Sequence, residues 1–226
     1  MIDPLSNFEW SSLHGRYDRL CRRFGSRVTF PDSFVPRPTS DRELYYFLVE
    51  RLAVGRTHFE IGVEWYEAML YWKLYSQPAA VANVYKPICE NESLRCVTGR
   101  KLSELSRRLP ADLPRDQGAL LQLIKSFTRE AVHGMASFDA FPVRTTFLHF
   151  VYPEVVPIFD KQVLRAVGVF EKNANHSAQY LLEYVVFAWE LANKYSHHFG
   201  LFGRETATRL IDMALWVSRG SGGANS

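Results

Sequence analysis

The chain of 226 residues is predicted to be an all-α protein, with one globular helical domain over residues 1–219. Three observations lead to this prediction. Apolar residues recur at helical spacing, capping residues and glycines mark the ends of the periodic segments, and 47% of the residues are hydrophobic. Two helical lobes around a cleft are an alternative arrangement of the same domain. The Gly/Ser-rich tail, residues 220–226, is expected to be disordered.

The first helix is predicted near the N-terminus, in residues 13–27. Its apolar positions repeat at helical spacing, and Gly25 is a natural stop: Leu13, Tyr17, Leu20 and Phe24. Four arginines share one adjoining stripe: Arg16, Arg19, Arg23 and Arg27. This stripe is interpreted either as a solvated face or as a ridge that contacts phosphates.

A proline-rich connector follows, with a short strand expected at Arg27–Phe30. Ser40 and Glu43 then form a capping box, which predicts a helix that ends at Gly55.

The next predicted helix, Phe59–Tyr75, carries three glutamates on one face: Glu60, Glu64 and Glu67. Carboxylates at this spacing could bind a metal. However, di-iron helices combine several Glu-x-x-His pairs, and the sequence contains none, so a solvated acidic face is favoured.

Further helices are predicted at Ala79–Glu90, Arg100–Leu109 and Asp116–Val132. Residues 180–195 are apolar nearly all round, which predicts a central buried helix. Residues 204–219 are amphipathic and predict the last helix.

Composition and missing motifs exclude several classes of protein. Three cysteines without a CxxC pair argue against disulfides and structural zinc, so we expect neither a metal nor a cofactor. The chain lacks the Gly-rich nucleotide-binding loops, the HExxH metalloprotease motif and the GxSxG hydrolase motif. No long apolar run or signal peptide is recognised, so the sequence predicts a soluble cytoplasmic protein. The net charge of +3 indicates no particular partner.

Residues 141–168 have an unusual layout. A helix from Pro142 to about Val151 is followed by a connector with two prolines, and a new helix begins at Lys161. Asp160 stands at the N-cap of that helix, where its carboxylate can accept backbone hydrogen bonds.

This layout resembles the helix-hairpin-helix superfamily of base-excision DNA glycosylases, and the resemblance covers roughly half of the chain. Phe141–Arg144 stands where the family has its DNA-binding hairpin, although the hairpin glycines are absent. Ile158-Phe159-Asp160 stands where the family has its catalytic aspartate. Ser76-Gln77-Pro78 resembles the turn that inserts a side chain into the duplex. In this resemblance Thr145 stands where the bifunctional members have their lysine.

The resemblance implies a monofunctional glycosylase that flips a base out of double-stranded DNA and cleaves its N-glycosidic bond with Asp160. The expected DNA contacts are Gln77, Arg144, Thr145, Thr146, Lys161, Arg16, Arg19 and Arg23. Two alternatives remain open at this stage. Asp160 could be a purely structural cap. The chain could also be a non-catalytic helical module that binds nucleic acid or protein.

Overall fold

A computed structural model describes residues 1–24, 38–54, 61–127, 132–137 and 140–219. It is 69% helical and contains no strand among these residues, which confirms the predicted all-α class and a single compact domain. The longer helices are α1 (Leu13–Leu20), α2 (Asp41–Val54), α3 (Val63–Leu74), α6 (Glu92–Arg108), α7 (Gln117–Phe127), α8 (Phe141–Val151), α10 (Ala178–Lys194) and α11 (Ala207–Ser218). The shorter ones are α4 (Pro78–Ala80), α5 (Lys86–Glu90) and α9 (Lys161–Ala166), with a π-helical turn at Val81–Tyr85. Single 3-10 turns lie at Trp10–Ser12, Ala174–His176 and Ser196–Leu201.

Helix starts follow the sequence closely. The Oγ atom of Ser40 accepts the amide of Glu43, as expected for a capping box. The Glu43 carboxylate turns instead to Thr39, whose amide and hydroxyl both donate to it. The helix predicted after the two-proline connector begins at Lys161, and Asp160 is its N-cap. The predicted strand at Arg27–Phe30, the stop at Gly25 and the tail at 220–226 lie outside the described residues.

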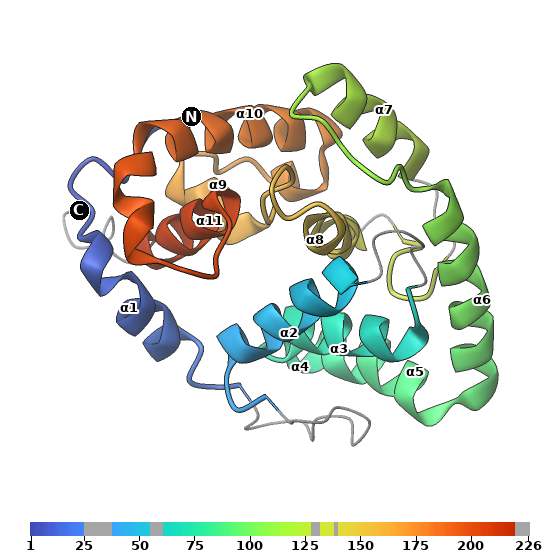
Figure 1. Ribbon diagram of the computed structural model, residues 1–226. Helices are drawn as coiled ribbons and strands as arrows, with labels where there is room; N and C mark the ends of the chain where they lie inside the picture. The colour runs from blue at the N-terminus through green and yellow to red at the C-terminus, as the bar shows by residue number, and fades with distance from the viewer. Residues whose placement is uncertain (25–37, 55–60, 128–131, 138–139, 220–226) are drawn as a thin grey trace.

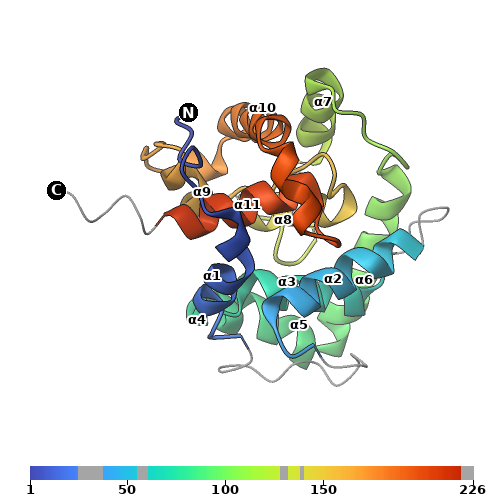
Figure 2. The same ribbon diagram turned by 60° about the vertical axis from the view of Figure 1, so that its left-hand side comes forward.

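Three helices make up most of the interior. Nine of the twelve residues of α3 are buried, as is nearly all of α8 and most of α11. In both views α8 lies between α10 and the pair α2–α3 (Figures 1 and 2). The first and last helices, α1 and α11, pack against each other, and α11 also contacts α9 and α10.

The sequence misjudged which helix is central. The segment predicted as a central buried helix is α10, which lies at the edge of the molecule and buries one face only (Figure 1). The segment predicted as amphipathic is α11, whose polar positions Thr208, Arg209 and Asp212 are buried as well. Partly buried aromatic residues on α10 and buried polar residues on α11 reversed the pattern, because periodicity does not show what covers a face.

Within the described residues, no helix combines the length and the hydropathy needed to cross a lipid bilayer.

Candidate functional site

A cleft of about 880 Å³ opens between segments that are far apart in the sequence. Its lining comes from α1 and the turn that follows it, from the end of α3, from the start of α9 and from α11. This volume is in the range of small-molecule and cofactor sites. Four aromatic side chains with buried or half-buried rings take part in the lining: Tyr17, Trp72, Tyr75 and Trp216.

Asp160 lies in this cleft rather than in the core. One carboxylate oxygen, Oδ1, accepts the amides of Gln162 and Val163 at 2.7 and 3.2 Å, which caps α9. Because these two bonds use the same oxygen, the other oxygen, Oδ2, is left to face the cleft. The side chain is 23% exposed. Asp160 is therefore fixed by the backbone and still accessible to a ligand.

Lys73 lies beside Asp160, although nothing in the sequence pairs the two residues. Its Nζ atom is 3.4 Å from Oδ2 of Asp160, and the lysine side chain is only 9% exposed. α3 thereby brings an amine into the cleft. The sequence argued against lyase chemistry because Thr145 replaces the family lysine, and that argument did not take Lys73 into account.

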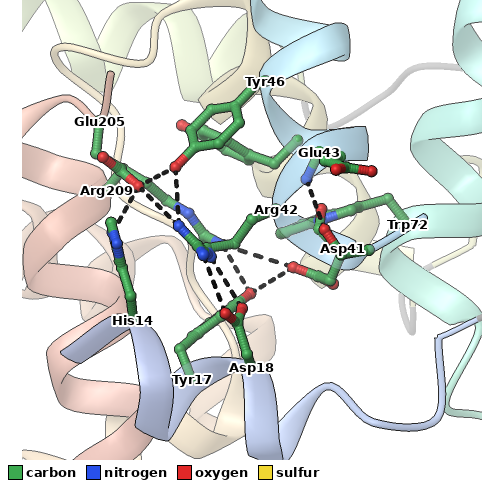
Figure 3. Close-up of polar contacts among 12 residues, drawn as sticks. His14, Tyr17, Asp18, Asp41, Arg42, Glu43, Tyr46, Trp72, Glu205 and Arg209 are labelled. Atoms are coloured by element: carbon green, nitrogen blue, oxygen red, sulfur yellow. Dashed lines mark hydrogen bonds and ion pairs between the residues drawn. The ribbon is translucent and has the colours of Figure 1, made fainter. Parts of the chain in front are cut away.

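A buried polar cluster from three helices forms the floor of the cleft (Figure 3). Tyr17 of α1 donates to Asp41 of α2 at 2.8 Å, and Arg209 of α11 donates to Tyr17 at 2.7 Å. The Arg209 guanidinium also lies within about 5 Å of three ring centroids, at 5.0, 4.4 and 5.3 Å from Tyr17, Tyr45 and Trp72. Burial raises the pKa of the Asp41 carboxyl, and Arg209 opposes that shift.

A second polar group lies next to this cluster (Figure 3). Arg42 of α2 forms a two-bond ion pair with Asp18 of α1, at 2.8 and 3.0 Å. The buried Glu205 carboxylate accepts the Tyr46 hydroxyl, and His14 lies 2.8 Å from it. These contacts fix α1 against α2 and against the loop before α11.

Asp212 is a third aspartate at the cleft and is only 2% exposed. It accepts the Ile158 amide at 2.6 Å and the Tyr184 hydroxyl at 2.7 Å. Burial raises the pKa of Asp212 to about 7, and the nearby Asp160 carboxylate acts in the same direction. The bond to Ile158 holds the connector that ends at Asp160, so Asp212 helps to position that residue.

His149, which lies on α8, contacts the same connector. The ring is completely buried, between Tyr45 Oη at 2.9 Å and Val156 O at 2.6 Å. Burial lowers the pKa of His149 to about 3, so the ring is neutral. Its Nδ1–H then donates to the carbonyl, and Nε2 accepts the tyrosine hydroxyl.

The charge of the cleft favours an anionic ligand. Among the described lining residues, three are aspartates and seven carry a positive charge: Arg19, Arg22, Arg23, Lys73, Lys161, Arg209 and Arg219. Since the net charge of the whole chain is only +3, the cations are concentrated at this site.

Five of the predicted site residues meet in the cleft: Asp160, Lys161, Gln77, Arg19 and Arg23. Gln77, in the α3–α4 turn, and Lys161, at the start of α9, are exposed there. Arg16 does not line the cleft, and its guanidinium lies 5.1 Å from the Phe8 ring centroid.

The other three predicted DNA contacts are buried in α8. Arg144 is 4% exposed and donates to the carbonyls of Met135 and Ser137, so its guanidinium binds the turn that precedes α8. Thr145 and Thr146 donate to Pro142 O, with Thr145 also near Phe159 O. The segment that resembles a DNA-binding hairpin is therefore packed into the interior.

Sequence reasoning missed several residues of the site. Lys73, Arg209 and Asp212 sit on helices whose patterns indicated a core or a solvent face. Trp216 and Arg219, at the end of the last helix, were read only as part of its amphipathic pattern. A buried arginine and aspartate three residues apart on α11 are visible in the sequence, but their burial is not.

The glutamates of α3 do not form a metal site. Glu67, predicted on a solvated face, is buried and pairs with Arg95 at 2.7 Å; Glu64 contacts the same arginine at 3.0 Å. Glu60 lies outside the described residues. No group of histidine, cysteine, aspartate or glutamate side chains in the described part of the chain is arranged to hold a metal ion.

Comparisons with protein-family models, with curated proteins and with solved structures find no match for this chain.

Proposed function

We propose that this protein binds DNA and cleaves an N-glycosidic bond, with Asp160 as the carboxylate that assists departure of the base. One observation carries the proposal: Asp160 is held by two backbone amides and opens into a cleft whose described lining is rich in cations. Cytoplasmic location is part of the same proposal, since the three cysteines are free thiols.

The proposed reaction depends on the positive charge that develops on the sugar. As the base departs with the bonding electrons, positive charge develops on the sugar, and a carboxylate beside it stabilises that state. Water then adds to the sugar and loses a proton, which leaves an abasic site. Asp160 suits this role because its position is fixed before the substrate arrives, so little reorganisation is needed. The cations around it would contact the phosphates on either side.

An incision assay tests the proposal. Duplexes and single strands that each carry one damaged base are incubated with protein and then treated with alkali, which breaks the strand at abasic sites. We expect cleavage with the natural chain and at least a hundredfold loss with Asp160→Asn, which keeps an N-cap but removes the charge.

Asp116→Asn is the matched control for this assay. Asp116 caps the start of α7 by accepting the Ala119 amide at 2.8 Å, and it does not line the cleft. Full activity in Asp160→Asn, or an equal loss in Asp116→Asn, would remove Asp160 from the reaction.

A non-catalytic nucleic-acid-binding module is the second candidate. The Lys73–Asp160 ion pair favours it, because the ammonium already offsets the carboxylate charge. DNA binding without excision of any base in the panel would support this alternative.

A further inference from the structure

Arg219 and Trp216 form a flat polar platform in the cleft. The Arg219 guanidinium carbon lies 3.8 Å from the centroid of the Trp216 ring, so the two groups are in van der Waals contact. Tyr17 also contacts the indole, with its ring centroid 5.3 Å from that of Trp216 and an angle of 50° between the two ring planes. Both Arg219 and Trp216 line the cleft and are half-buried.

The platform shares the cleft with Asp160, since all three side chains are part of its lining. Burial lowers the pKa of Arg219, and the Asp160 carboxylate opposes this shift. A ligand stacked on the platform would therefore place its next group near the carboxylate.

Further cations line the same cleft as the platform. Arg19 and Arg22, at the end of α1, are exposed in the same cleft, and neither forms an ion pair with another described residue. Lys161 lies exposed at the start of α9. A planar stacking surface among cations is the combination that single-stranded nucleic acids use, because bases stack on the plane while the cations follow the phosphates.

The position of these groups disfavours a paired strand as the ligand. In a duplex the faces of each base are covered by its neighbours, so only a base in a single strand or one flipped out of the duplex can stack on a protein surface, and flipping costs free energy. In addition, three side chains predicted to contact duplex DNA, Arg144, Thr145 and Thr146, are buried outside the cleft lining.

We propose that the cleft binds an unpaired, single-stranded segment of DNA, with one base stacked on the Arg219 guanidinium and with Trp216 supporting that group from behind. This inference rests on the proposed function and narrows its substrate to DNA that is single-stranded at the reacting nucleotide. Neighbouring phosphates lie against Arg19 and Arg22.

Fluorescence anisotropy of the full chain tests this, with a labelled oligothymidylate and a labelled hairpin duplex of matching length. We expect the oligothymidylate to bind at least tenfold more tightly than the duplex at the same salt concentration. Its affinity should fall as salt rises, with a log–log slope of about −0.7 for each phosphate contacted.

Variants of Arg219 then separate stacking from charge. Arg219→Ala should weaken oligothymidylate binding by about 5- to 100-fold, the range for loss of one stacked base. Arg219→Lys keeps the charge without the plane and should recover only a small part of the loss. Arg107→Ala, an exposed position on α6 outside the cleft lining, is the matched control and should bind like the natural chain. Because Arg219 follows the last turn of α11, these changes spare the core.

The outcomes test DNA binding and the preference for a single strand separately. Equal or tighter binding to the duplex would overturn the single-strand inference and leave DNA binding intact. If both Arg219 variants bound oligothymidylate as tightly as the natural chain, Arg219 and Trp216 would not be the stacking site. Absence of binding to either probe at low ionic strength would overturn the proposed function together with this inference.

Discussion

Asp160 combines two tasks in one side chain. Through Oδ1 it caps α9, and through Oδ2 it reaches the cleft and Lys73. A cap and a catalytic carboxylate need the same placement, since both depend on a carboxylate fixed at a helix start. Stability and activity must therefore be measured on the same variants.

We expect Asp160→Ala to lower the free energy of unfolding by about 1 kcal/mol, the usual cost of losing an N-cap. Asp160→Asn should cost less, because an amide oxygen can still accept the two α9 amides. Urea titration of both variants measures the difference, with Asp116→Ala at the exposed cap of α7 as a comparison. Equal losses for the alanine and asparagine variants of Asp160 would mean that its charge, not its cap, supports the fold.

Asp212 predicts a pH dependence of stability. Its pKa is about 7 in the folded chain and near 3.8 when unfolded. Between these values the folded state holds a proton that the unfolded state has released, so stability falls as pH rises from about 4 to 7. The contribution is at most a few kcal/mol, since one pKa unit corresponds to about 1.4 kcal/mol.

Asp212→Asn should remove the contribution of this carboxyl to the pH dependence of stability. The free energy of unfolding of the natural chain should fall, relative to that of the variant, as the pH is raised across this window. Denaturant titrations at several pH values give the comparison, and Asp116→Asn should follow the natural chain. Parallel curves for the natural chain and Asp212→Asn would contradict the raised pKa.

At the scale of helices, the floor of the cleft depends on the junction of α1, α2 and α11. Tyr17, Asp41 and Arg209 come from these three elements, are nearly completely buried and are joined by hydrogen bonds through Tyr17 (Figure 3). Arg209 also forms an ion pair with Asp41, at 3.9 Å. A buried ion pair contributes little net stability, but removing one partner leaves an uncompensated charge. Replacing one member of this ion pair should therefore destabilise the junction more than replacing both members together.

We expect Arg209→Met to destabilise the protein by about 3–5 kcal/mol, because Asp41 stays buried without its cation. Adding Asp41→Asn should restore part of that loss. A double-mutant cycle by thermal or urea unfolding measures the coupling between the two positions. Additive effects of the two substitutions would show that they do not interact.

At the scale of the whole molecule, helix should dominate every spectroscopic measure. Far-UV circular dichroism should correspond to about two-thirds helix, given that the structure is 69% helical. Washing with a chelator should leave the spectrum and the melting temperature unchanged, since no metal-binding group occurs among the described side chains. A stoichiometric metal in the purified chain would contradict this expectation.

Local features were readable from the sequence because they depend on neighbours along the chain. Helical spacing predicted the all-α class, the capping box predicted the start of α2, and the two-proline connector placed Asp160 at the start of α9. The resemblance to the glycosylase family, rather than local spacing, named Asp160, Lys161 and Gln77 as site residues, and all three line the cleft.

Burial and pairing were decided only by the tertiary structure. Lys73 and Asp160 are 87 positions apart, and Arg209 and Tyr17 are 192 apart, so no local pattern could join them. Arg144 and Glu67 carry charges that usually mark a surface, yet packing buries both and supplies carbonyls or an arginine as partners. Sequence determines where helices begin and which face is apolar, whereas the environment of each charge depends on which distant helix packs against it.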